Sequence, residues 1–258
     1  MNNTKKPKII EELEYLYHLT LEEVDDISGK NGYVLDINNN VIALNLSICN
    51  IHEIISFENI KELKLLQSLN LSDNYISELK NLEELKSLQK LYLSDNQIKE
   101  IKNLEELKSL KVLYLARNDI SKIKNLEKLK SLKELHLFGN NIIEIENLEE
   151  LKNLNVLDLD NNKIDEIKNL KELKLLKKLD LSNNNIYKIV EVRKLFINHI
   201  YLSTLLIFKN PFLAELNDLK LEESWEGNNL QDLKDYFQGI DDNTAVEIQS
   251  IKKIMLVG

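Results

Sequence analysis

Five side chains that could bind a partner or transfer a proton recur in this chain once every 22 residues: Tyr92, Tyr114, His136, Asp158 and Asp180. A histidine one period away from an aspartate suggests general-base catalysis or metal binding. Those functions need a nucleophile or a third ligand, and neither accompanies the pair. Aromatic side chains with charged neighbours are the composition of protein-binding hot spots. The series therefore favours a protein-binding surface, with no cofactor and no metal.

The same 22-residue step governs an eleven-residue pattern, L-x-x-L-x-L-x-x-N-x-I, in the middle of the chain. One copy consists of Leu88, Leu91, Leu93, Asn96 and Ile98. With two looser copies at the ends, eight copies lie within residues 41–212. A period of about 20–29 residues with this signature is typical of a leucine-rich-repeat solenoid.

Each L-x-L segment is predicted to be a short strand. Side chains alternate along a strand, so the two leucines point inward and the residue between them points outward. One such strand cannot bury its leucines alone, whereas stacked copies share a continuous core. We therefore predict an α/β fold, a leucine-rich-repeat solenoid in the shape of a right-handed horseshoe or arc, with eight parallel strands on its concave face.

The asparagine of each copy follows the strand, where its amide can bond backbone groups that would otherwise be buried without partners. Leaving such a group unpaired costs roughly 1–3 kcal/mol. Leucine-rich repeats accept Cys in place of Asn, so the single cysteine is interpreted as a buried core residue and not as a nucleophile. The predicted structural ladder consists of Cys49, Asn74, Asn96, Asn118, Asn140, Asn162, Asn184 and Asn210.

The outward strand positions of the central copies carry aromatic residues, and an acidic strip lies beside them. These positions define the predicted binding site on the concave face. The predicted partner-binding residues are Tyr92, Val112, Tyr114, Arg117, His136, Phe138, Asp158, Asp160 and Asp180.

The segments that return to the next strand have an apolar residue at every third position, as in Ile98, Ile101, Leu104, Leu107 and Leu110. Spacing by three stays aligned on a 3₁₀ turn and drifts around an α-helix. We therefore expect short 3₁₀ or single-turn helices on the convex face, with the intervening Glu and Lys side chains in water.

The two ends depart from the repeat. Residues 1–40 are predicted to form a cap, with a helix over about 7–27 and a hairpin between strands at 33–37 and 41–47. Residues 213–250 are predicted to be a helical connector, with a helix at 230–237. The final segment, 251–258, looks like a buried strand that meets Gly258.

The repeats resemble the 22-residue class shared by a phosphatase-1 regulatory subunit and bacterial internalins. The order of segments resembles the amino-terminal half of a Roco protein: Asn210-Pro211, then the helix at 230–237, then Lys253-Ile-Met-Leu-Val-Gly258. That resemblance implies that 251–258 is the first strand of a Ras-like GTPase domain and that Gly258 begins its nucleotide-binding loop. The remaining groups of that loop would follow Gly258.

The composition limits the kinds of partner that the chain is expected to bind. The formal net charge is −9 and no large basic cluster occurs, so nucleic acid is not an expected partner. No apolar run approaches the roughly 18 residues of a membrane span, and the polar N-terminus lacks the pattern of a signal peptide. We expect a cytoplasmic protein that does not enter a membrane, and one cysteine excludes an internal disulfide.

The sequence therefore predicts a non-enzymatic protein-interaction module. On the Roco-type interpretation, the repeats would bind partner proteins or an intramolecular GTPase domain of a longer protein. Two alternatives stay open: a stand-alone regulatory subunit that resembles the phosphatase regulator, and an adhesin that resembles internalin.

Overall fold

The computed structural model describes residues 6–54, 63–188, 195, 199, 201–207 and 209–211, and the backbone of 224–226. The first element is the α-helix α1 (Lys8–Tyr17). The strands are β1 (Glu22–Glu23), β2 (Gly32–Leu35), β3 (Val41–Asn45), β4 (Ser68–Asn70), β5 (Lys90–Tyr92), β6 (Val112–Tyr114), β7 (Glu134–His136), β8 (Val156–Asp158), β9 (Lys178–Asp180), β10 (Thr204–Leu206) and β11 (Ser224–Glu226).

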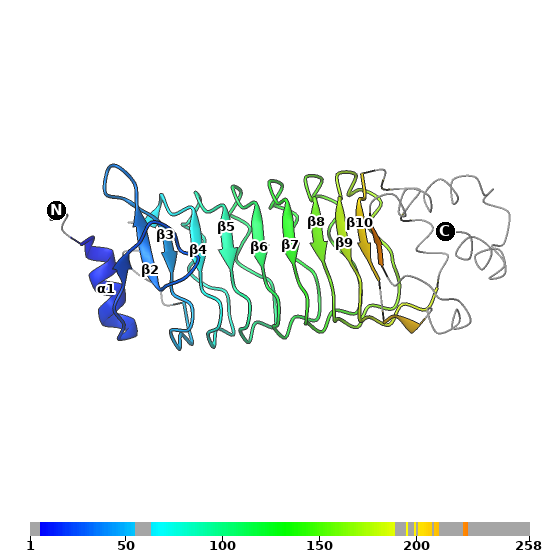
Figure 1. Cartoon of the computed structure of the whole chain (residues 1–258), viewed down its shortest axis with the longest axis horizontal. Helices are drawn as coiled ribbons and strands as arrows, with labels where there is room; N and C mark the ends of the chain where they lie inside the picture. Colours follow the sequence, from blue (N-terminus) through cyan, green and yellow to red (C-terminus); the bar gives the residue numbers. More distant parts are fainter. Residues whose placement is uncertain are drawn as a thin grey trace.

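The strands form a single sheet in which each is paired with its neighbours in the sequence, from β1 to β11. They lie side by side along the long axis of the molecule (Figure 1). The eight strands β3 to β10 run parallel, as predicted. The hairpin of β2 and β3 adds an antiparallel pair at one end, and β11 pairs antiparallel with β10 at the other.

The core lies between this sheet and the return segments. The central residue of each three-residue strand from β4 to β10 is buried, and in β5 to β9 it is a leucine with no exposed surface. The leucine that follows each of β5 to β9, such as Leu93 or Leu115, is equally buried. Each fully buried leucine contributes roughly 2 kcal/mol of transfer free energy. The stacked leucines therefore provide the main force that holds one coil against the next.

The return segments consist of separate single turns. In one coil, the Leu107 N–H bonds the Leu104 carbonyl at 2.9 Å and the Leu110 N–H bonds the Leu107 carbonyl at 2.9 Å. These are the three-residue bonds that the spacing predicts, but over 66–188 they do not join into a helix. A left-handed residue precedes the turns, such as Asn103 with φ of 59°, and a helix cannot extend back through that conformation.

The N-terminal helix is shorter than predicted. It ends at Tyr17, because His18 adopts the left-handed conformation with φ of 54° and its N–H bonds the Glu14 carbonyl. The Glu14 carboxylate then accepts the Leu21 N–H at 2.7 Å and pairs with Lys6 at 2.7 Å. The prediction of a helix to residue 27 was wrong, since the apolar stripe continues past the point where these polar contacts turn the chain.

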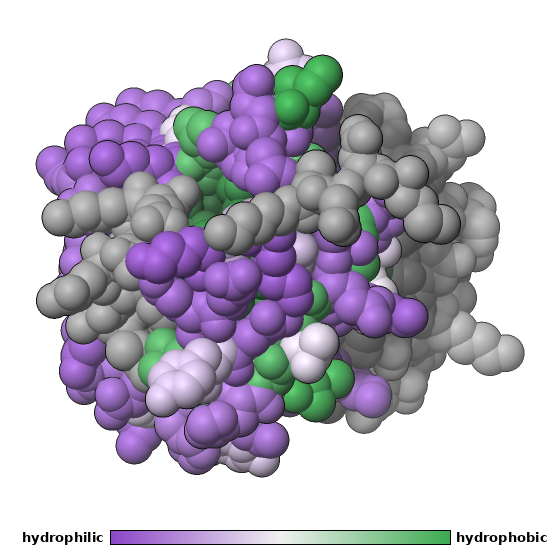
Figure 2. Space-filling model, turned by 90° about the vertical axis from the view of Figure 1, so that its left-hand side faces the viewer, coloured by the Kyte–Doolittle hydropathy of each residue, from purple (hydrophilic) through white to green (hydrophobic). Residues whose placement is uncertain are grey.

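The predicted hairpin of the cap is present. The Asp36 carboxylate bonds the backbone N–H groups of Asn38 and Asn40 in its turn, at 2.9 and 2.8 Å. Beside it, β1 approaches β2 so closely that a Cβ on Gly32 would lie 2.4 Å from the Glu22 carbonyl oxygen. Seen from this end, the molecule is largely hydrophilic with small, separate hydrophobic patches, as expected of a cap over an apolar core (Figure 2).

The predictions for the C-terminal part lie mostly outside the described residues. They include Phe212, the helix at 230–237, the strand at 251–258 and Gly258. Within 213–250 the structure describes only the backbone of β11. Among the described residues, no helix is long and apolar enough to cross a membrane.

Candidate protein-binding face

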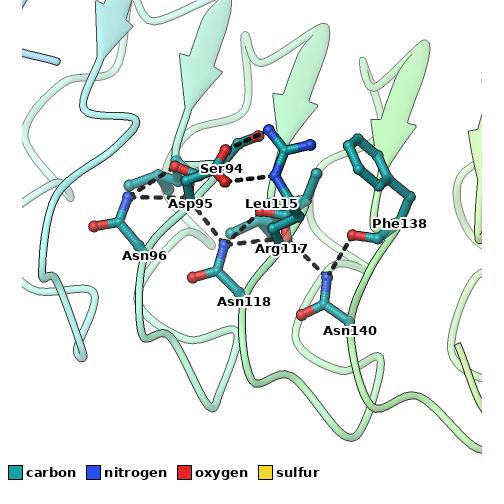
Figure 3. A network of polar contacts seen from close by, with 10 residues as sticks. Ser94, Asp95, Asn96, Leu115, Arg117, Asn118, Phe138 and Asn140 are labelled. Atoms are coloured by element: carbon teal, nitrogen blue, oxygen red, sulfur yellow. Dashed lines mark hydrogen bonds and ion pairs between the residues drawn. The ribbon is translucent and has the colours of Figure 1, made fainter. Parts of the chain in front are cut away.

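The asparagines after the strands form one row in the interior. Asn118 is typical: its Oδ1 accepts the Ile98 N–H at 2.9 Å. Its Nδ2 donates to the carbonyls of Leu93, Leu115 and Ala116 at 3.0–3.2 Å, and Figure 3 shows Asn118 beside Leu115. Each such side chain therefore connects its own coil to the preceding one. The same pattern occurs at Asn74, Asn96, Asn140, Asn162, Asn184 and Asn210.

Cys49 occupies the equivalent position in the first coil. Its backbone N–H bonds Asn74 Oδ1 at 3.0 Å, and its Sγ contacts Asn31 Nδ2 and the Ser47 carbonyl at 3.3 Å each. The side chain is half-buried and not buried as predicted, because its neighbour on the N-terminal side is the cap and not another repeat. Burial nevertheless raises the pKa of the Cys49 thiol.

A second asparagine row was missed by the sequence analysis. In one member, Asn103 Nδ2 donates to the Leu79 carbonyl of the preceding coil at 2.6 Å, with φ of 59°. Asparagine tolerates this left-handed conformation better than most residues. The sequence signal was the tripeptide Lys/Glu-Asn-Leu at the same 22-residue step. The row consists of Asn81, Asn103, Asn125, Asn147 and Asn169.

The outward side chains of the parallel strands form a surface on the side of the sheet away from the leucine core, which we call the sheet face. Strand register aligns Tyr92, Tyr114, His136, Asp158 and Asp180 in one row along it. The first three rings stack: centroids are 5.2 Å apart between the tyrosines and 4.0 Å apart between Tyr114 and His136, with interplanar angles of 26° and 7°. Because rings from neighbouring strands stack on one another, each ring is held in its orientation with an edge toward the outside.

His136 lies between two carboxylates. Its Nδ1 is 3.5 Å from Asp158 Oδ2, and its Nε2 is 3.7 Å from Glu134 Oε2. Among the described residues, no group of three or more His, Cys, Asp or Glu side chains is placed to hold a metal ion. The His136–Asp158 pair therefore belongs to the stacked row and forms no larger ligand set within that part of the chain.

Burial shifts the acidities of this surface. It raises the pKa of Tyr92 and Tyr114, and it raises the pKa of Asp180, where the charges of Asp158 and Asp160 act in the same direction. A backbone hydrogen bond from Ser182 opposes the shift at Asp180. The three aspartates thus place negative charge at the β8–β9 end of the row.

Arg117 stands at the edge where the strands end. Two of its guanidinium nitrogens pair with the Asp95 carboxylate, one contact at 2.6 Å, and the guanidinium carbon lies 5.0 Å from the centre of the Phe138 ring (Figure 3). Arg117 itself has φ of 48°, and Gly139 leaves room for it, since a Cβ there would lie 3.1 Å from Arg117 Cγ. Arg117 and Phe138 therefore form one packed unit.

The predicted site residues thus share one surface of the described structure. Val112 lies in the outward row before Tyr114 and is aligned with Glu134 and Val156 of the next two strands. Asp160 accepts a hydrogen bond from Asn183 at 2.6 Å. The structure brings together a stacked aromatic row, a packed Arg–Phe unit and an acidic end.

Comparison with known protein families gives matches to two family models. "Leucine Rich repeats (2 copies)" matches residues 64–106, 86–130, 108–153 and 130–172, and "Leucine Rich Repeat" matches 175–195. Together these matches extend over half of the chain. The protein belongs to the leucine-rich-repeat family.

Solved structures agree with this fold. An internalin, InlF, from Listeria monocytogenes is 23% identical with a TM-score of 0.58, and the match covers 78% of this chain and 64% of that one. A leucine-rich-repeat protein from Leptospira interrogans is 30% identical with a TM-score of 0.59, covering 65% and 43%. TLR13 in its complex with ssRNA13 is 29% identical with a TM-score of 0.58, covering 66% and 25%.

The chain thus spans less than two thirds of the length of these internalin and Leptospira structures. No curated protein matches it. The matched families and these structures are leucine-rich-repeat proteins, and they give no support to the Roco-type interpretation.

Proposed function

We propose that this chain is a protein-binding module whose sheet face is its binding site. The observation that carries the proposal is the stacked row of Tyr92, Tyr114 and His136, which continues into the acidic end. Leucine-rich-repeat proteins commonly bind other proteins, and solenoids use their extended sheets for this purpose. We place the residues of the site as the sequence suggested, with the Arg117–Phe138 unit beside the row.

The stacked rings suit binding for an energetic reason. A side chain that is already held by its neighbours loses little conformational freedom when a partner covers it. Tyr92 and Tyr114 present an apolar ring edge and a hydroxyl, so each can contribute both contact area and a hydrogen bond. Anchors of this kind can each contribute about 2 kcal/mol or more to a protein interface.

Changing Tyr92, Tyr114 and Phe138 together to Ser tests the proposal. These side chains leave the sheet on the side away from the leucine core, so the variant should fold and keep its circular dichroism spectrum. Proteins captured by the wild-type chain are identified by mass spectrometry, and their affinities are then measured by calorimetry. The triple variant should lose at least about tenfold in affinity for them.

The matched control changes Tyr15, Tyr75 and Tyr187 to Ser. These tyrosines are exposed at 83%, 45% and 47%, and they lie outside the sheet face. The control should bind like the wild type. Equal affinity of the sheet-face variant for the same partners would place the binding site elsewhere on the molecule.

We further propose that the chain is not an enzyme by itself and acts in the cytoplasm. The module would serve equally in a stand-alone regulatory subunit or an internalin-like adhesin. Fractionation of the native cells with an antibody to the chain tests the location. Recovery at the cell surface or in the medium would favour the adhesin.

The Roco-type interpretation is a finer version of this proposal, and it rests on 251–258, which lie outside the described residues. If Gly258 begins a phosphate-binding loop, the lysine and Ser/Thr of that loop come after it. Calorimetry of the present chain with GTP should then give no binding heat. The gene sequence after codon 258 decides the family: the absence of a Gly-Lys-Ser/Thr pattern there would exclude it.

A further inference from the structure

One edge of the sheet face carries a row of lysines that have no acidic partner among the described residues. They precede or begin the strands β5, β6, β7 and β9. Backbone hydrogen bonds align the coils at this edge: the Lys133 N–H bonds the Lys111 carbonyl, and the Lys177 N–H bonds the Asn155 carbonyl, both at 2.8 Å. All are exposed. The row, which we call the lysine edge, consists of Lys90, Lys111, Lys133, Lys177 and Lys178.

Several lysines of the return segments are paired across coils. Lys102 lies 3.8 Å from Glu78, Lys124 lies 3.0 Å from Glu100, and Lys168 lies 3.2 Å from Glu144. No lysine of the lysine edge lies within 4.0 Å of a carboxylate of the described residues. Lys111 contacts an amide, Gln89 Oε1, at 2.8 Å. Lys86, Lys152 and Lys174 of the return segments likewise lie in no ion pair of the described residues, so the lysine edge is distinguished by its alignment along the sheet face.

At β8 and β9 the opposite ends of the strands are acidic. In β9, Lys178 begins the strand and Asp180 ends it. Asp158 ends β8 beside Asp180, and Asp160 follows two residues later. Two or three residues along a strand correspond to about 7–10 Å. An α-helix with its side chains is about 10 Å wide. A helix laid beside the stacked row would therefore have the lysine edge on one side and, on the other, the stacked rings at β5 to β7 and the aspartates at β8 and β9.

The spacing along the molecular axis also fits a helix. Neighbouring strands are about 4.8 Å apart, and one helical turn rises about 5.4 Å. Over three strand steps the mismatch is roughly 2 Å, which a lysine side chain can absorb. An extended strand repeats one face every 7 Å or so, and over the same three steps it would drift by about 6 Å.

We propose that the partner lays an amphipathic α-helix along the axis of the solenoid, across β5 to β9, with carboxylates toward the lysine edge and cations toward Asp158, Asp160 and Asp180. The apolar stripe of that helix would contact the side of the stacked row that faces the lysine edge. This inference rests on the proposed function of the sheet face and adds the shape and charge pattern of the partner.

The probes are cross-linked helical peptides of about 18 residues, longer than the roughly 19 Å that β5 to β9 span. All share a leucine stripe. One has Glu on one flank and Lys on the other, a second has Glu on both, and a third has Lys on both. The peptide with opposite flanks should bind the full chain at least about tenfold more tightly than either of the others, because it alone complements both rows.

Reversing the lysine edge with Lys90→Glu, Lys111→Glu and Lys133→Glu should abolish that preference and favour the peptide with Lys on both flanks. The matched control, Lys86→Glu, Lys152→Glu and Lys174→Glu, makes the same charge change at exposed lysines of the return segments. It should retain the wild-type preference. Circular dichroism verifies that both variants fold.

Equal binding of the three peptides, or an equal loss in the control, would overturn the inference. So would equal affinity for an uncross-linked, proline-broken peptide with opposite flanks, or tight binding of a single-stranded RNA that requires the lysine edge. The proposed function fails separately: it falls if the Tyr92, Tyr114 and Phe138 triple variant keeps its captured partners. If the triple variant loses its partners while the variant with the reversed lysine edge keeps them, the sheet face is the binding site but the partner does not bind as the proposed helix.

Discussion

The interior and the sheet face of the central repeats follow the same 22-residue period and differ in how they use it. In the interior, Leu91, Leu113 and Leu135 are identical and fully buried. On the face, the adjacent positions carry Tyr92, Tyr114 and His136 and are only partly buried. An interior side chain contacts its own copy in the next coil, so the same residue fits every time. A side chain on the sheet face can vary without disturbing the packing of one coil on the next, and that variation can determine which partner binds.

The largest expected effect is in the interior, at Asn118→Ala. The change removes four hydrogen bonds and leaves the Ile98 N–H without its partner, while the three carbonyls keep bonds from Asn96, Asn140 and the Asp95 N–H. An unpaired buried group costs roughly 1–3 kcal/mol and each further lost bond about 1 kcal/mol, so we expect a loss of about 3 kcal/mol. Urea denaturation monitored by circular dichroism measures it.

The control for Asn118 is Asn185→Ala, at an exposed asparagine with a single long contact of 3.5 Å to the Lys163 carbonyl. Its effect should stay within about 0.5 kcal/mol. Similar losses for both variants would show that the interior row has no special role in stability.

A smaller effect is expected in the second asparagine row. Asn103→Ala loses the bond to the Leu79 carbonyl and forces alanine into a left-handed conformation, which together should cost about 2 kcal/mol. Asn103→Gly loses only the hydrogen bond and should cost about 1 kcal/mol. Thermal or urea unfolding distinguishes the two. A glycine variant as unstable as the alanine variant would contradict the conformational part.

These rows show what the sequence could predict. Both asparagine rows repeat at the period of the leucines, so both could be predicted from the sequence. Only the row that includes Asn118 was recognised. The second row, with Asn103, was overlooked because it lies among solvated Lys and Glu residues. The parallel strands were predictable for the same reason: the leucines repeat without drift.

Other features depend on contacts that no period encodes. The end of α1 is fixed by Glu14, which captures the Leu21 N–H after the chain has turned. The position of Arg117 depends on the missing Cβ of Gly139, one coil away. The sequence placed the aromatic residues in a row, but their stacking depends on the separation and tilt of real strands.

The reactivity of Cys49 reports on how well the first coil is covered by the cap. Because burial raises its pKa, a smaller fraction is thiolate at pH 7 than in the unfolded chain, and the half-buried sulfur is also less accessible. We expect alkylation about tenfold slower in the folded protein than in urea, equivalent to roughly 1.4 kcal/mol. The rate in the folded state should keep rising above the usual thiol pKa of about 8.5. Rapid stoichiometric labelling of the folded protein would show that Cys49 is not held in the row.

The smallest effect on stability is expected on the sheet face, at Arg117→Gly. Glycine relieves the left-handed strain at φ of 48°, which is worth roughly 1 kcal/mol, while the exposed ion pair with Asp95 and the contact with Phe138 are each worth about 0.5–1 kcal/mol. These contributions nearly cancel, so the stability should change by less than about 0.5 kcal/mol. Arg117→Ala keeps the strain, loses the contacts and should cost about 1 kcal/mol, falling in 1 M salt.

If Arg117 belongs to the binding face, both Arg117 variants should weaken partner binding measured by calorimetry even though one of them is as stable as the wild type. A variant with unchanged stability and reduced affinity would separate the two surfaces at a single residue. Unchanged affinity in both variants would leave Arg117 as a structural neighbour of Phe138 and would limit the binding face to the stacked row and its acidic end.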